Sequence, residues 1–93
     1  MTQSTILPVG VTAATSSDIV IPLGSFVTVG VFTNSTLDAP SGSVFTILQD
    51  SPGADIEVAT LSAGKSIQIL GPGTFRVRRT ASTGKPFGVF KEV

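Results

Sequence analysis

The sequence contains no cysteine, histidine, tryptophan or tyrosine among its 93 residues. The lack of cysteine excludes disulfides, and the lack of both cysteine and histidine removes the usual ligands of a zinc site. Nucleophilic catalysis loses its common partners too, because no histidine can act as a base and no cysteine as a thiolate. We therefore expect no metal, no cofactor and no enzymatic activity.

Charged side chains are also scarce: they make up 13% of the chain, against 41% for apolar residues. The usual charged share is about 25%, so little charge is left to cover the surface of a monomer. All six basic residues lie from Lys65 onward, whereas five of the six acidic residues precede it. The net charge of zero hides an acidic front and a basic tail, which predicts association of the chain with copies of itself.

Long apolar runs are missing, since the longest, residues 26–32, is interrupted by Thr28 and Gly30 and falls short of the ~20 residues that cross a membrane. The N-terminal MTQSTILPVG has no basic residue and lacks the uninterrupted apolar segment of about 7–15 residues of a secretory signal, so we expect neither such a signal nor a membrane partner. The length predicts one domain, residues 1–93, that buries roughly 60–65% of the surface of its unfolded chain. Because no disulfide or zinc site can reinforce so thin a core, subunit association is the expected source of further stability.

Apolar residues repeat with a period of two, and β-branched residues, glycine and proline recur throughout. This pattern predicts an all-β fold: a small antiparallel β-sandwich of about seven to eight strands, with either jelly-roll or immunoglobulin-like topology. Turn residues predict two hairpins, at residues 50–53 and 71–73. The expected strands cover residues 6–12, 19–23, 26–33, 43–49, 55–61, 66–70, 74–79 and 87–91.

Alternation along the strands divides the side chains between two faces, because residues two apart point to the same side. The expected core contains Phe75 and Val77 together with Ile56, Val58, Ile67 and Ile69. In residues 26–32 the valines take one side and the phenylalanines the other, which is typical of a central strand or of a subunit contact. The contact interpretation assigns the oligomer interface to Val27, Val29, Val31 and Phe32.

The basic tail provides a second candidate surface, because alternation turns Arg76 and Arg78 away from the expected core. Nucleic acid is not the expected partner, since the sequence has no interleaved exposed aromatics, no RNA-binding motif and no net positive charge. An acidic protein surface, such as the acidic half of a neighbouring subunit, suits this face better. The predicted interaction face consists of Arg76, Arg78, Arg79 and Lys85.

Three acidic residues leave an alternative open. Asp55 and Glu57 lie two apart on one expected strand, roughly 6.5–7 Å between Cα atoms, near the carboxylate spacing of inverting glycosidases. Together with Asp50 they offer oxygen ligands for a calcium ion. A general acid needs enclosed, apolar surroundings, and this pair lies beside a turn, so a solvated outer face is the favoured interpretation.

Three segments of the C-terminal half show strand and turn patterns: residues 44–50 (VFTILQD), 71–79 (GPGTFRVRR) and 87–90 (FGVF). In these segments the chain resembles small virion structural proteins of tailed phages. The resemblance implies a β-sandwich that assembles in the host cytoplasm, resides in the virion and binds a capsid or tail as an accessory piece. It also implies a trimer or other closed oligomer without catalytic function, and it carries over no functional residues.

Two functions from different classes remain. The first is a non-enzymatic structural protein that binds a phage particle, as a capsid decoration or a head or tail accessory subunit, through its own copies and through capsid or tail proteins. The second is a carbohydrate- or receptor-binding β-sandwich module. That alternative needs exposed aromatic rings to stack on sugars, and only the six phenylalanines can supply them.

Overall fold

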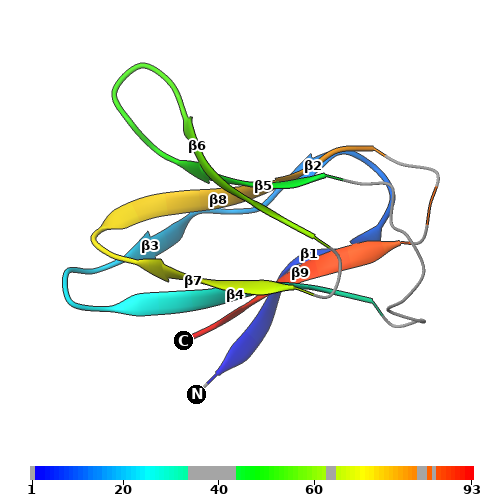
Figure 1. The fold of residues 1–93 in the computed structure, drawn as a ribbon, viewed down its shortest axis with the longest axis horizontal. Helices are drawn as coiled ribbons and strands as arrows, with labels where there is room; N and C mark the ends of the chain where they lie inside the picture. Colours follow the sequence, from blue (N-terminus) through cyan, green and yellow to red (C-terminus); the bar gives the residue numbers. More distant parts are fainter. Residues whose placement is uncertain (1, 34–43, 63–64, 82–83, 85) are drawn as a thin grey trace.

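A computed structural model of the chain describes residues 2–33, 44–62, 65–81, 84 and 86–93. Two antiparallel β-sheets pack against each other, and the described residues contain no helix (Figure 1). This arrangement confirms the predicted all-β sandwich. The strands are β1 (Gln3–Gly10), β2 (Ala14–Thr15), β3 (Ile19–Ile21), β4 (Phe26–Phe32), β5 (Phe45–Gln49), β6 (Ile56–Leu61), β7 (Ser66–Leu70), β8 (Gly73–Arg79) and β9 (Phe87–Glu92).

The order of the strands identifies the topology. One sheet has the order β1-β9-β4-β7, and the other has the order β2-β8-β5-β6, with β3 also paired to β8. Because β2 and β3 pair with successive parts of β8, they act as one interrupted edge strand. The two sheets then follow the strand order of a jelly roll, which decides between the two topologies that the sequence left open. The two-residue β2 was not predicted, because it is too short to show a period of two.

Side chains from both sheets meet in one apolar core between them. Phe75 and Val77 of β8 are buried as predicted, and so is Ile69 of β7, while Ile67 packs against the core from its edge. Both sheets contribute because alternate residues of each strand face the opposite sheet. The largest fully buried side chains are Phe45, Phe87, Ile19, Ile21, Ile47, Val29, Val77 and Val89.

Strand β4 corrects the predicted oligomer contact. It lies between β9 and β7, and Val27, Val29 and Val31 are buried in the core between the sheets. A side chain that already packs against the opposite sheet is not available to a second subunit, so these valines form no oligomer contact in the folded chain. Phe32 points to the other face of the sheet and is half-buried. The central-strand interpretation of this segment is the right one.

Strand β6 corrects part of the predicted core. Ile56 and Val58 were expected to be buried, yet they are 52% and 46% exposed. Ile47 of β5 pairs with Ala59, but the next residue, Leu48, pairs with Glu57. Val58 is therefore the extra residue of a β-bulge. Because β6 is also the edge strand of its sheet, no further strand of the described chain covers these side chains.

The turn after β3 and the turn after β7 meet at one end of the sandwich, at the left of Figure 1. The hairpin predicted at residues 50–53 joins β5 to β6 and is confirmed. The hairpin predicted at residues 71–73 is wrong, because β7 pairs with β4 and β8 pairs with β5, so the turn between β7 and β8 crosses from one sheet to the other. The Gly71 amide donates to the Ser25 carbonyl at 3.0 Å, and the Ser25 amide donates to the Pro22 carbonyl at 3.1 Å. A Cβ on Gly71 would collide with the backbone of Pro22, so only glycine allows this close packing. The turns after β3 and β7 are thereby tied together.

Candidate interaction surfaces

Arg76 points outward from β8, as predicted, but it binds acidic residues of its own chain. Its Nε lies 2.7 Å from Asp18 Oδ1 and its Nη1 lies 2.6 Å from Asp55 Oδ1, while Asp50 Oδ1 is 3.9 Å from Nη2. The hydrogen bonds to Asp55 and then to Asp18 raise the pKa of Arg76 above its ordinary value. Attraction between the acidic front and the basic tail is therefore partly satisfied within one chain.

This arrangement separates the carboxylates that were considered for catalysis or calcium. Asp50 and Asp55 face Arg76, whereas Glu57 lies farther along β6 and is exposed. In the described part of the chain no group of three or more acidic residues is placed to hold a metal ion. Asp18 joins the cluster from the segment before β3, a partner that spacing along the sequence does not reveal.

Arg79 corrects the predicted basic face, because it lies inside the molecule and is only 3% exposed. It shares the inward side of β8 with Val77, as alternation along a strand requires. Its guanidinium donates hydrogen bonds to the carbonyl oxygens of Thr12 (2.8 Å), Pro8 (2.7 Å) and Phe87 (2.8 Å). These bonds connect β8 of one sheet to β1 and β9 of the other, and we call this arrangement the carbonyl clamp.

Little of the predicted basic face remains for a partner. Arg78 is exposed on the outer side of β8, and Arg76 is partly covered by its carboxylates. Lys85 lies outside the described residues. The three arginines of β8 thus have three different environments, although the sequence pattern places them in one group.

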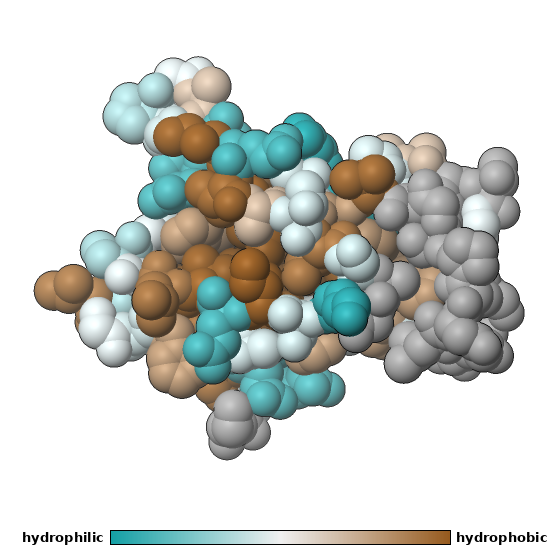
Figure 2. Space-filling view, in the orientation of Figure 1, coloured by the Kyte–Doolittle hydropathy of each residue, from teal (hydrophilic) through white to brown (hydrophobic). Residues whose placement is uncertain are grey.

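Exposed apolar side chains gather at the end where the two turns meet. Leu23 is 82% exposed and Leu70 is 71% exposed, and Phe26, the cross-strand neighbour of Leu70, is half exposed. Val93 lies beside Phe26 in a shallow depression of the surface. We call Leu23, Phe26, Leu70 and Val93 the apolar tip; Figure 2 shows apolar groups at this end with more hydrophilic surface between them. Adjoining exposed apolar side chains mark interaction sites, whereas single ones do not.

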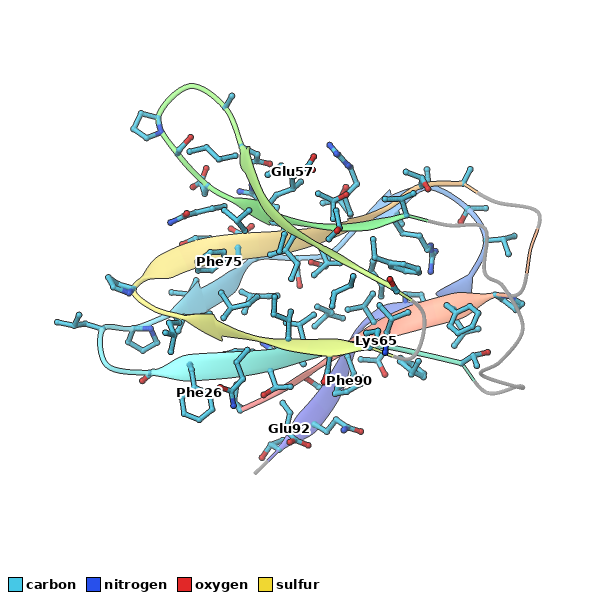
Figure 3. The ribbon with its side chains drawn as sticks, viewed as in Figure 1. Phe26, Glu57, Lys65, Phe75, Phe90 and Glu92 are labelled. Carbon is cyan, nitrogen blue, oxygen red and sulfur yellow. The ribbon has the colours of Figure 1, made fainter. Side chains whose placement is uncertain are left out.

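The outer face of the sheet that contains β4 carries an aromatic pair. The ring centroids of Phe32 and Phe90 lie 6.1 Å apart at an interplanar angle of 59°. Phe90 covers Gly30 of the neighbouring strand, where a Cβ would come within 2.5 Å of the ring, so this contact requires glycine. Figure 3 shows Phe90 on the side of the sheet that faces away from β8. A pocket of about 220 Å³ is lined by the pair and by Gln3, Ser4 and Thr5.

An apolar cleft opens between the two sheets on the side where β6 and β7 form their edges. Its volume is about 350 Å³, and Val58 of β6 and Ile67 of β7 line it from opposite sheets. Phe75 of β8 also contributes to its lining. Figure 2 shows apolar surface across the middle of the molecule between these strands. The exposure of Val58 follows from its position at this cleft.

Comparison with known proteins gives no assignment, because no family model, no curated protein and no solved structure matches the chain. Within the described ranges, no helix is long and apolar enough to cross a membrane. Any argument about function therefore depends on three surfaces: the apolar tip, the aromatic pair and the cleft between β6 and β7.

Proposed function

We propose that this chain is a non-enzymatic structural protein of a phage particle, a capsid decoration or a head or tail accessory subunit. It docks on a capsid or tail protein through its apolar tip. The observation that supports the proposal is the exposure of Leu23, in the turn after β3, and of Leu70, the last residue of β7. The hydrogen bond from the Gly71 amide to the Ser25 carbonyl ties the end of β7 to that turn. Because the backbone of both segments is already ordered, binding need not pay for ordering a loop and has only side-chain rotamers to fix.

The chemistry of the tip indicates the chemistry of its partner. Burial of apolar surface contributes about 25 cal/mol per Å², so an apolar patch on the particle is the favoured counterpart. Glu92 lines the same depression as Phe26 and Val93 and is the one acidic group there in the described chain. A basic residue at the rim of the particle's patch would complement it.

The jelly-roll topology agrees with this proposal by analogy. Jelly rolls occur in viral capsid domains and also in lectins. A shared fold does not determine a function, so the topology supports both functions that the sequence left open. The surface residues have to distinguish them.

The genes next to the one that encodes this chain provide the first test, since capsid, portal or tail genes are expected there. Particles lacking this protein would then be purified, mixed with the purified chain and sedimented. The wild-type chain should co-sediment, and Leu23→Asp should bind at least about tenfold more weakly, because the new carboxylate would lose its water on docking.

Val44→Asp is the matched control, because Val44 is also an exposed apolar residue but precedes β5, away from the apolar tip. It should bind as the wild type does. A metabolic operon around the gene, or equal binding by Leu23→Asp and the wild type, would contradict the proposal.

The aromatic pair favours a second candidate, a carbohydrate- or receptor-binding module. Phe32 and Phe90 present rings beside the amide of Gln3 and the hydroxyl of Thr5, a combination that can stack on and hydrogen-bond to a sugar. A glycan array is the test, with a signal that Phe90→Ala abolishes and Leu23→Asp retains. No signal for the wild-type chain would remove this candidate.

A further inference from the structure

The two lateral sides of the sandwich differ in how their strand edges are protected. On one side, β1 contains Pro8 and two register shifts against β9, and β2 and β3 are only two and three residues long. Proline, irregular register and short length block pairing with another chain. On the other side, β7 contains no proline, glycine or charged residue and keeps an unbroken register with β4. Among the residues that the structure describes, no strand pairs with the outer side of β7, so β7 is an open edge beside the apolar cleft.

The hydrogen bonds between β7 and β4 show which backbone groups remain for a further strand. The Val31 amide donates to the Lys65 carbonyl, and the Gly71 amide donates to the Ser25 carbonyl, each at 3.0 Å. Both bonds fit the β4–β7 register, so the odd-numbered residues of this segment bond to β4. Because antiparallel strands alternate in this respect, the even-numbered residues point their amides and carbonyls outward. The outward groups belong to Ser66, Gln68 and Leu70.

We propose that β7 pairs antiparallel with β7 of a second copy around a twofold axis at Gln68. In this register Gln68 faces Gln68 of the second copy and Ser66 faces Leu70, so every outward residue enters a hydrogen-bonded pair. A twofold contact brings the same surface together from both subunits. The segment Ile67-Gln68-Ile69 reads the same in both directions, so this register places isoleucine opposite isoleucine on both sides of the axis.

The side chains of β7 suit this pairing on both faces of the sheet. On the inner face, Ile67 of one copy lies opposite Ile69 of the other at about 4.5 Å between Cα atoms, so apolar packing continues across the joint. On the outer face, the two Gln68 amides can donate and accept hydrogen bonds to each other. Self-pairing of β6 is less favourable, because β6 has a bulge at Val58 and would bring two Glu57 side chains together.

This dimer is the form of self-association that we infer for the particle-binding protein. Its role on a particle rests on the proposed function, but its formation does not. If the chain binds particles as a monomer, the dimer is wrong and the proposed function stands. If a dimer of this register forms but binds no particle, the interface stands and the proposed function is wrong.

Light scattering coupled to size-exclusion chromatography is the first measurement, over a dilution series from about 100 µM to about 1 µM, so that a dimer Kd of ~1 µM and its tenfold rise both fall within the series. The wild-type chain should have twice its 9.5 kDa chain mass. Gln68→Lys places two ammonium groups opposite each other and should raise the dimer Kd at least about tenfold. Thr15→Lys adds the same charge at an exposed position of β2 and should leave the mass unchanged. A monomeric or trimeric wild type, or equal masses for the two variants, overturns the proposal.

Single cysteines test the register, because the chain has no cysteine of its own. Hydrogen-bonded partners lie about 5.5 Å apart between Cα atoms, within the range of about 4.4–6.8 Å that a disulfide bridges, so oxidised Gln68→Cys should migrate as a covalent dimer. In Ser66→Cys the two positions are separated by four residues along the strands, roughly 14 Å, and should not link. Equal linking of both variants, or no linking of Gln68→Cys, contradicts a twofold axis at Gln68.

Discussion

Arg76 and Arg79 lie three residues apart on β8 and have opposite surroundings. Arg76 faces outward and is neutralised by the carboxylates of Asp18 and Asp55. Arg79 faces inward and donates only to carbonyl oxygens in the described part of the chain. Attraction between charges holds Arg76 in place, whereas hydrogen bonding to the backbone holds Arg79.

The difference shows how a buried charge can contribute to a fold without an ion pair. A buried guanidinium loses its hydration, which is unfavourable unless hydrogen bonds replace it. The carbonyl clamp replaces it with three backbone acceptors: Pro8 on β1 and Phe87 on β9 of the opposite sheet, and Thr12 between β1 and β2. Removal of Arg79 would take one buried donor from each of those carbonyls, while removal of Arg76 would leave carboxylates that water can reach.

The largest effect is expected for Arg79→Met, which keeps much of the volume but removes every donor. We expect a loss of about 3 kcal/mol in the free energy of unfolding and a fall in melting temperature of at least about 12 °C. Thermal denaturation followed by circular dichroism measures it. Arg78→Met, the same change at the exposed neighbour, is the control. A melting temperature for Arg79→Met equal to that of Arg78→Met would refute the carbonyl clamp.

Arg79→Lys should have an intermediate effect of about 1–2 kcal/mol, because one ammonium cannot reproduce a planar guanidinium that reaches carbonyls on three segments. The charge itself is preserved, so this variant separates geometry from charge. Urea denaturation gives the free energy of unfolding. If Arg79→Lys were as unstable as Arg79→Met, the stability of the fold would not depend on the number of hydrogen bonds that residue 79 donates to the three carbonyls.

Arg76→Ala should lower the urea midpoint by less than Arg79→Lys, through repulsion among the remaining carboxylates. The effect should shrink between about 0.1 M and 1 M salt, where the screening length falls from about 10 Å to 3 Å. Because the pKa of Arg76 is raised, its ion pairs are present below the ordinary arginine pKa and are lost only as the pH rises through the raised value. The difference from the wild type should therefore stay constant between about pH 7 and pH 10. A salt-independent difference would point to lost packing instead.

Arg78→Ala should change stability least, within about 0.5 kcal/mol, because Arg78 is exposed. The same variant in the particle sedimentation assay tests what is left of the predicted basic face. Weaker binding with unchanged stability would show that Arg78 contacts the partner. Unchanged binding would leave the apolar tip as the docking surface.

Local pattern predicted the elements of the fold well. The expected strand at 66–70 coincides with β7, and the strand expected at 26–33 exceeds β4 by one residue. The inward position of Arg79 was also available from alternation with Phe75 and Val77, but the run of arginines was interpreted as one basic face instead. Leu23 was missed because the strand expected at 19–23 included it, whereas β3 ends at Ile21 and Leu23 lies in the turn after Pro22.

The all-β class, the position of most strands and the side to which their residues point could be predicted from the amino-acid sequence, since each follows from neighbours along the chain. The pairing of the strands, the central position of β4 and the open edge of β7 within the described ranges became known only from the three-dimensional packing. It alone brought Asp18 to Arg76 and the carbonyls of Pro8 and Phe87 to Arg79. These contacts depend on the packing of two sheets whose strands are far apart in the sequence, and a period of two carries no record of that pairing.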